Sequence, residues 1–336
     1  MLKRIVLNKF LFIFVSTVPV MHTVRSALGS FFFRPMSNKL PRGLDEQLQL
    51  LIERGMTVND KDSARHFLQN ISYYRLKGYW WDMQSDRENH IFEAGTTFEQ
   101  VIERYNFDRH LRIILFDAIE RIEIALRTKM IYHLSLSYGP LWYSDGSIFT
   151  DKNKHKEHLD GLNREFGFSN EIFIKDHKKR YPELEPEAWK IMEVASMGTL
   201  SKFYKNLNHQ LREKSIIANE MGLNLHSELS SWLESIVYVR NIIAHHSRLW
   251  SRNMVKIPID DIKNPQSDWL NDILLPVQKK RPFLIISAMI YLCNKVSPNH
   301  QIKTKILELI ETNSTVPIYK LGFLNNWNSQ PIWIEE

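Results

Sequence analysis

The longest uninterrupted helical pattern in this chain runs from Thr97 to about Ser137, and it constrains the fold more than any other feature. Apolar residues recur there at three- and four-residue spacings, and the next glycine and proline are Gly139 and Pro140. Such spacings place the apolar side chains on one face of an α-helix. Thr97 and Gln100 form a capping-box pattern, which marks a helix start. We predict one long helix that serves as the central scaffold.

The rest of the body also has helical patterns. Only 12 glycines and 13 prolines occur among 336 residues, which favours helices over a β architecture with many turns. We expect shorter helices near residues 44–56, 60–74, 186–207, 209–221, 226–250, 281–294 and 299–310. The sequence therefore predicts an all-α protein. We divide it into an extension (1–35), an N-terminal helical region that packs on the core (36–95) and a helical domain with C-terminal helices and a tail (96–336).

The net charge of +6 comes mostly from the first 35 residues, which contain five basic residues and no acidic residue. The body is therefore nearly neutral, and any polyanion site must be a local patch. Residues 1–35 have a basic start and an apolar run, Phe10–Val15, that is too short to span a membrane. They resemble a signal-like or tethering segment, or else translation begins at Met36. The single cysteine, Cys293, fits a reducing compartment, and we predict a cytoplasmic protein.

The most informative polar residues lie in the stretch from Ile236 to Trp250. Arg240 and His245 form an Arg-x4-His pair within a pattern that otherwise reads as a buried helix. A fixed cation and an imidazole suit RNA phosphodiester chemistry. Chance alone supplies about one such pair in a chain of this composition, so the spacing by itself is weak. Charged residues in an apolar helix need a partner or a function, however, because their burial is costly.

Two interpretations of this stretch remain open from the residues alone. In the first, Arg240 pairs with Glu120 or Glu123 of the long helix, and the two histidines favour the helix C-terminus. In the second, Arg240 and His245 act on RNA. Five residues turn a helix by about 500°, which leaves these two side chains about 140° apart. We therefore expect a loosened helix or a second copy to complete the site. Asn241, His245, Arg248 and Arg252 are predicted to share one helical face.

A second histidine pair, His155-x2-His158, has a spacing that occurs in metal sites. Lysines flank it and no third ligand is evident, so a solvated helical face is the simpler interpretation. Glycine-rich phosphate loops and zinc-protease motifs are absent from the sequence. We predict neither a metal nor a cofactor.

The chain resembles the Abi-like (abortive infection) proteins, a branch of the HEPN superfamily of helical nucleotide-binding proteins and RNases. The resemblance covers most of residues 44–333 as a co-linear series. Its segments are Leu50-Leu-Ile-Glu-Arg-Gly-Met56, Phe67-Leu, Tyr73-Tyr-Arg-Leu-x-Gly-Tyr79, Thr96-Thr-Phe-Glu, Tyr105-x-Phe-Asp-Arg-x-Leu-Arg112, Ala118-Ile-Glu-Arg-Ile-Glu-x-x-x-Arg127, Arg240-Asn-x-x-Ala-His-His-Ser-Arg-Leu-Trp250 and Leu321-Gly-Phe-x-x-x-Trp327.

The resemblance implies a HEPN-like helical bundle that acts as a metal-independent endoribonuclease in anti-phage defence. It implies that Arg240 holds the scissile phosphate and that His245 is the general acid or base. Asn241, His246 and Arg248 would be auxiliary contacts. The implied partners are RNA, a second copy that completes a composite site, and an inhibitory RNA or antitoxin. The alternative is a non-catalytic helical protein that binds RNA or a partner.

Overall fold

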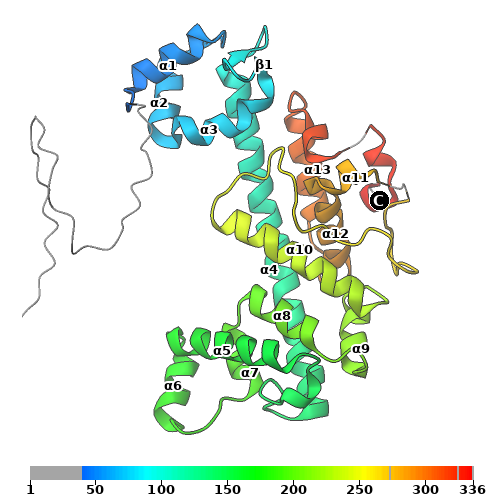
Figure 1. Cartoon of the computed structure of the whole chain (residues 1–336). Coiled ribbons are helices and arrows are strands. Elements are labelled where there is room, and N and C mark those ends of the chain that lie inside the picture. The colour runs from blue at the N-terminus through cyan, green and yellow to red at the C-terminus, as the bar shows by residue number, and fades with distance from the viewer. Residues whose placement is uncertain (1–39, 272–273, 324, 335–336) are drawn as a thin grey trace, which may run out of the picture. The chain divides into compact units, whose positions relative to one another are not determined.

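The helix α4 (Phe98–Tyr138) is the axis on which the other elements are arranged (Figure 1). Its 41 residues correspond to a length of about 60 Å. At its start the Thr97 hydroxyl accepts the Gln100 N–H at 3.1 Å, and the Gln100 side chain accepts the Thr97 N–H at 3.0 Å. At its end Gly139 has a φ of 84°, which favours glycine and stops the helix. The predicted long helix and its capping box are confirmed.

The computed structural model describes residues 40–271, 274–323 and 325–334. The predictions for residues 1–35 lie outside these ranges. Residues Gly43–Glu336 form one compact unit. The predicted division between residues 95 and 96 falls in the connection between β2 and α4 of this unit.

The elements that precede α4 are short. They are α1 (Leu44–Glu53), α2 (Lys61–Ile71), α3 (Tyr73–Trp80), β1 (Gln84–Asp86) and β2 (Ile91–Phe92). The two strands pair antiparallel, with Gln84 opposite Phe92. They form the only sheet among the described residues, so the predicted all-α class is confirmed.

The elements that follow α4 are also helical. They are α5 (Lys152–Phe168), α6 (Ile172–Arg180), α7 (Ala188–Ile191), α8 (Met197–Asn206), α9 (Arg212–Glu220), α10 (His226–Ala244), α11 (Pro276–Lys279), α12 (Pro282–Val296) and α13 (Ile302–Thr312). Short 3₁₀ turns occur at Trp81–Met83, Gly146–Ile148, Met192–Val194, Ile318–Leu321, Trp327–Ser329 and Pro331–Trp333.

The core lies where α4 packs against α3, α8, α9, α10, α12 and α13. The helix α12 is apolar on all sides, and every residue from Pro282 to Cys293 is buried. A helix with this pattern must be covered by neighbours, and α12 contacts both α4 and α10. Ion pairs at i, i+4 spacing lie along α4, including Asp117–Arg121 at 2.7 Å and Glu123–Arg127 at 2.6 Å.

Candidate functional site

The helix that carries the Arg-x4-His pair ends earlier than the sequence predicts. The last helical residue of α10 is Ala244, and His245 caps the helix. The His246 N–H donates to the Ile243 carbonyl at 2.9 Å, and the Ser247 N–H donates to the Ile242 carbonyl at 2.8 Å. These two bonds form a Schellman motif, a common way to end a helix. The predicted helix to about Trp250 is therefore wrong.

His246 occupies the position of this motif that glycine usually takes. Its φ is 53°, a left-handed conformation that is uncommon for residues other than glycine. The chain leaves the helix axis at this point. Consequently Arg248 and Arg252 do not continue the helical face of Asn241 and His245, as the periodicity predicted.

Arg240, the residue expected to bind the scissile phosphate, has no side-chain hydrogen-bond or ion-pair partner in the part of the chain that the structure describes. Its side chain is partly buried and makes no hydrogen bond or ion pair there. Glu123, one of its two expected partners, pairs with Arg127 at 2.6 Å, and Glu120 is exposed. The expected ion pairs between Arg240 of α10 and Glu120 or Glu123 of α4 are therefore not formed.

Asn241 and His245 are exposed at the end of α10. The backbone N–H of His245 donates to the Asn241 carbonyl at 3.1 Å, which continues the helical hydrogen bonding by one residue. The His245 ring makes no hydrogen bond to any described residue. Its roles as general acid or base, and that of Asn241 as an auxiliary contact, remain predictions.

The two auxiliary residues after the helix both contact α3. The Arg75 guanidinium donates to the carbonyl of His246. Arg248 packs over Gly78, where an added Cβ would lie 2.9 Å from its Nε. Its Nη1 donates to the Trp250 carbonyl at 2.6 Å, and burial lowers the pKa of its guanidinium. A Cβ at position 78 would therefore require the Arg248 side chain to shift.

A buried carboxylate, Asp108 of α4, fixes the backbone that follows Arg248. Its Oδ1 accepts the N–H groups of Leu249 at 3.0 Å and Trp250 at 2.7 Å. Its Oδ2 accepts the Tyr79 hydroxyl at 2.7 Å and the Arg112 Nε–H at 3.2 Å. These four donors match an ionised carboxylate, because a protonated carboxyl would bring a fifth donor to the cluster.

Burial strongly affects the titration of this cluster. It raises the pKa of Asp108, while the Tyr79 hydrogen bond, the Arg112 charge and the two backbone N–H groups oppose that rise. Burial also raises the pKa of Tyr79, and the Asp108 charge adds to the effect. The Tyr79 hydroxyl therefore stays protonated and remains a donor to Asp108.

The Trp250 side chain also packs in this region. Its indole is fully buried and packs edge-on against Phe107, with ring centroids 6.3 Å apart. The Arg104 guanidinium lies 5.5 Å from the centroid of the Trp250 ring. Three segments that are far apart in the sequence, on α3, on α4 and after α10, therefore converge on the end of α10.

Two pockets of nearly equal volume are lined in part by residues of α4 close to this cluster. The first, which we call the arginine pocket, has a volume of about 590 Å³. Its lining residues are Arg75, Tyr105, Arg109, Arg112, Ile113, Phe116, Ile243, Ala244 and His246. Of the predicted site residues only His246 lines it. Sequence analysis missed Arg75, Arg109 and Arg112, although all three stand in segments that carry the resemblance.

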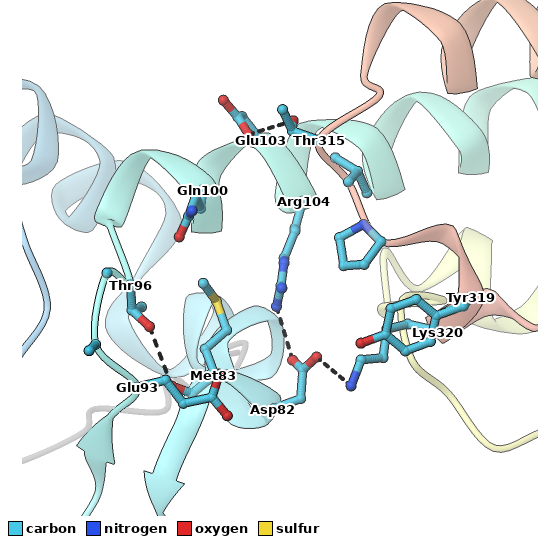
Figure 2. Close-up of a pocket in the computed structure, with 14 residues that line it drawn as sticks. Asp82, Met83, Glu93, Thr96, Gln100, Glu103, Arg104, Thr315, Tyr319 and Lys320 are labelled. Carbon is cyan, nitrogen blue, oxygen red and sulfur yellow. Dashed lines mark hydrogen bonds and ion pairs between the residues drawn. The ribbon is translucent and has the colours of Figure 1, made fainter.

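The second pocket, which we call the Asp82 pocket, has a volume of about 580 Å³ and is shown in Figure 2. Asp82 lies between two cations, with Oδ1 3.1 Å from an Arg104 nitrogen and Oδ2 3.1 Å from the Lys320 Nζ. Glu93 and Glu103 also line this pocket, and Glu103 accepts the Thr315 hydroxyl at 3.1 Å. Its cations are therefore neutralised within the pocket.

The second histidine pair has a structural role. His155 is buried, stacks on Phe149 with centroids 4.1 Å apart and hydrogen-bonds the Tyr143 carbonyl at 2.8 Å. The expected solvated face is therefore wrong for His155. Among the described residues no group of three or more His, Cys, Asp or Glu side chains could hold a metal ion. Among the same residues no helix is long and apolar enough to cross a membrane.

The fold and this cluster define an all-α protein in which a long helix anchors a basic motif at the end of a second helix. The family model of Abi-like proteins matches residues 66–251, which include all three converging segments. The chain belongs to the Abi-like protein family. The comparison with curated proteins and the comparison with solved structures found no match.

Proposed function

We propose that this protein acts in abortive infection as a metal-independent endoribonuclease of the HEPN type. Membership of the Abi-like family suggests the biological role. The observation that carries the proposed chemistry is that the Arg240 and His245 side chains are both without a hydrogen-bonding partner among the described residues. Arg240 has no ion-pair partner among the described residues, and the His245 imidazole is exposed at a helix end that Asp108 and Arg75 hold in place.

The proposed reaction is an attack by the 2′-hydroxyl of RNA on the neighbouring phosphate. The 2′-oxygen loses its proton and bonds to phosphorus, and the bond from phosphorus to the 5′-oxygen breaks. The leaving 5′-oxygen gains a proton, so the products are a 2′,3′-cyclic phosphate and a 5′-hydroxyl. His245 would transfer one of these protons, and Arg240 would stabilise the charge that develops on the phosphate oxygens.

A single copy presents these two residues in different directions. Arg240 lies near the end of α10 and His245 is its C-cap, and an interval of five helical residues corresponds to about 500° of rotation. We therefore propose that a two-fold dimer places Arg240 of one protomer beside His245 of its partner. In such an arrangement each dimer has two equivalent sites.

The test is RNA cleavage by the purified full-length protein in the presence of a metal chelator. Loss of a general acid or base costs about 10²–10⁴-fold in rate, and we expect a loss of this size for His245→Ala. Arg240→Ala should be similarly impaired. The matched controls are His110→Ala and Arg87→Ala, since both side chains are exposed. Cleaved ends should carry a 2′,3′-cyclic phosphate, and DNA should not be cut.

Mixing the two inactive variants tests the composite site. If subunits exchange freely, half of the dimers are mixed and one of their two sites is intact, which restores about a quarter of wild-type activity. No recovery would contradict the shared site but not the reaction. Wild-type cleavage rates in both single variants would refute Arg240 and His245 as the catalytic pair. Absence of cleavage by the wild-type protein would favour a non-catalytic RNA- or partner-binding protein.

A further inference from the structure

The arginine pocket has features of a ligand site that the proposed reaction does not use. It lies between α3, α4 and the end of α10, and its volume of about 590 Å³ is within the range of small-molecule sites. His246, the residue after the proposed acid or base, forms part of its wall. A ligand in this pocket would therefore bind next to His245.

The charge of the pocket is strongly positive. Arg75, Arg109 and Arg112 line it, and none of its lining residues is a carboxylate. Arg109 is exposed and makes no hydrogen bond or ion pair with any residue that the structure describes. Guanidinium groups without a competing acid favour phosphate, which they bind through paired N–H donors.

Arg112 is the most informative of the three arginines. Its side chain is only 7% exposed, so its cation is largely removed from bulk water. Its Nε donates to Asp108, and no other hydrogen bond joins it to a described residue. Asp108 is already saturated by four donors. The remaining N–H groups of Arg112 are thus available to a ligand in the pocket that it lines.

The rest of the wall is apolar and partly aromatic. Phe116 is 47% exposed and Ile113 is 56% exposed, although both are large hydrophobic side chains. Tyr105 and Ile243 complete this surface. A flat apolar group can stack on such a wall, and every nucleobase has a face of this kind.

We infer that the arginine pocket binds one nucleotide unit, with its phosphate on the arginines and its base against Phe116 and Tyr105. This inference rests on the proposed function in so far as it identifies the ligand as part of the RNA substrate. The same chemistry would also recognise a free nucleotide. A nucleotide held here would fix the register of the strand relative to His245.

The experiment measures binding, so that it does not depend on cleavage. In a full-length His245→Ala background, the dissociation constant is measured for a fluorescent RNA pentanucleotide and for adenosine monophosphate. We expect Arg109→Glu to weaken binding at least tenfold and to lower the slope of log K against log salt by about one. The matched control Arg87→Glu reverses another exposed arginine that has no partner among the described residues, and it should bind as the background does.

The apolar wall has its own pair of variants. Base stacking contributes about 1–3 kcal/mol, so Phe116→Ala should weaken binding by about fivefold or more. Ile124→Ala is the control, because Ile124 lies on the same helix and is 48% exposed. Binding of both ligands identifies a free-nucleotide site, whereas binding of the RNA alone identifies a strand site, and either outcome supports the inference.

The inference is overturned if Arg109→Glu and Phe116→Ala bind both ligands as tightly as their controls. This failure is distinct from failure of the proposed function. If RNA cleavage requires Arg240 and His245 but nucleotide binding does not depend on Arg109, the proposed function stands and the nucleotide site does not. If nucleotide binding depends on Arg109 but the protein does not cut RNA, the nucleotide site stands and the proposed enzyme does not.

Discussion

The arginine pocket and the Asp82 pocket have nearly the same volume, but the charged residues that line the first are all cationic, whereas the second is lined by charges of both signs. They lie on roughly opposite faces of α4, because successive helical residues turn by about 100°. Arg104 faces the Asp82 pocket, where Asp82 neutralises it at 3.1 Å, and Arg109 faces the arginine pocket without a partner among the described residues. Two arginines five residues apart on one helix therefore have different roles.

The difference shows that the position of the carboxylates, and not the size of the cavity, determines what each pocket can bind. Asp82 lies within its pocket, between Arg104 and Lys320 (Figure 2). Asp108 lies behind the arginine pocket and is occupied by backbone N–H groups as well as by Arg112. Asp108 orients Arg112 through one hydrogen bond, and the other N–H donors of Arg112 stay free of described partners.

Removal of Asp108 should have the largest effect on stability. Breaking a buried ion pair by removing one partner costs about 3–5 kcal/mol, and we expect a loss of this size for Asp108→Ala. The variant leaves Arg112 buried without an acid and the N–H groups of Leu249 and Trp250 without their acceptor. Urea denaturation measures the change in the free energy of unfolding.

The control for this variant is Asp117→Ala on the same helix. Asp117 pairs with Arg121 and Lys305, but the three side chains are 28%, 36% and 50% exposed, so the loss should be below about 1 kcal/mol. Equal losses for the two variants would show that Asp108 is not the anchor of this region. The difference between the pockets would then need another explanation.

Neutralising Asp82, the carboxylate of the Asp82 pocket, should have a smaller effect on stability. We expect Asp82→Asn to reduce the free energy of unfolding by about 1–3 kcal/mol, because Arg104 and Lys320 lose a charged acceptor. RNA affinity should not change, since Glu93 and Glu103 still line that pocket. An increase in RNA affinity, measured in the His245→Ala background, would show that cation number alone decides which pocket binds RNA.

Replacing His246 by glycine should have the smallest effect on stability, and it should act in the opposite direction. Glycine adopts the φ of 53° without steric cost, so His246→Gly should gain up to about 1 kcal/mol in the free energy of unfolding. It also removes a side chain that lines the arginine pocket. Nucleotide affinity should therefore fall while the melting temperature rises. Unchanged affinity would exclude His246 from the proposed binding site.

Local patterns in the sequence determined the helices of this protein. The Thr97–Gln100 capping box, the absence of glycine and proline before Gly139 and the apolar periodicity predict α4 nearly to its ends. These signals work because hydrogen bonding and side-chain spacing within a helix depend on residues only a few positions apart. The same reasoning identified the Arg-x4-His motif that contains Arg240 and His245, whose role stays a prediction.

Only the tertiary structure decided where α10 ends and what surrounds its end. His246 takes a left-handed conformation without glycine or proline nearby, so the only local signal for the break is the preference of the two histidines for a helix C-terminus, where His245 is indeed the cap. The carboxylate that anchors the following backbone is Asp108, 141 residues away from Leu249. Whether Arg104 or Arg109 is neutralised likewise depends on which side chains other helices bring to each face of α4. A sequence determines such contacts only through the complete fold, because they join residues that no short pattern connects.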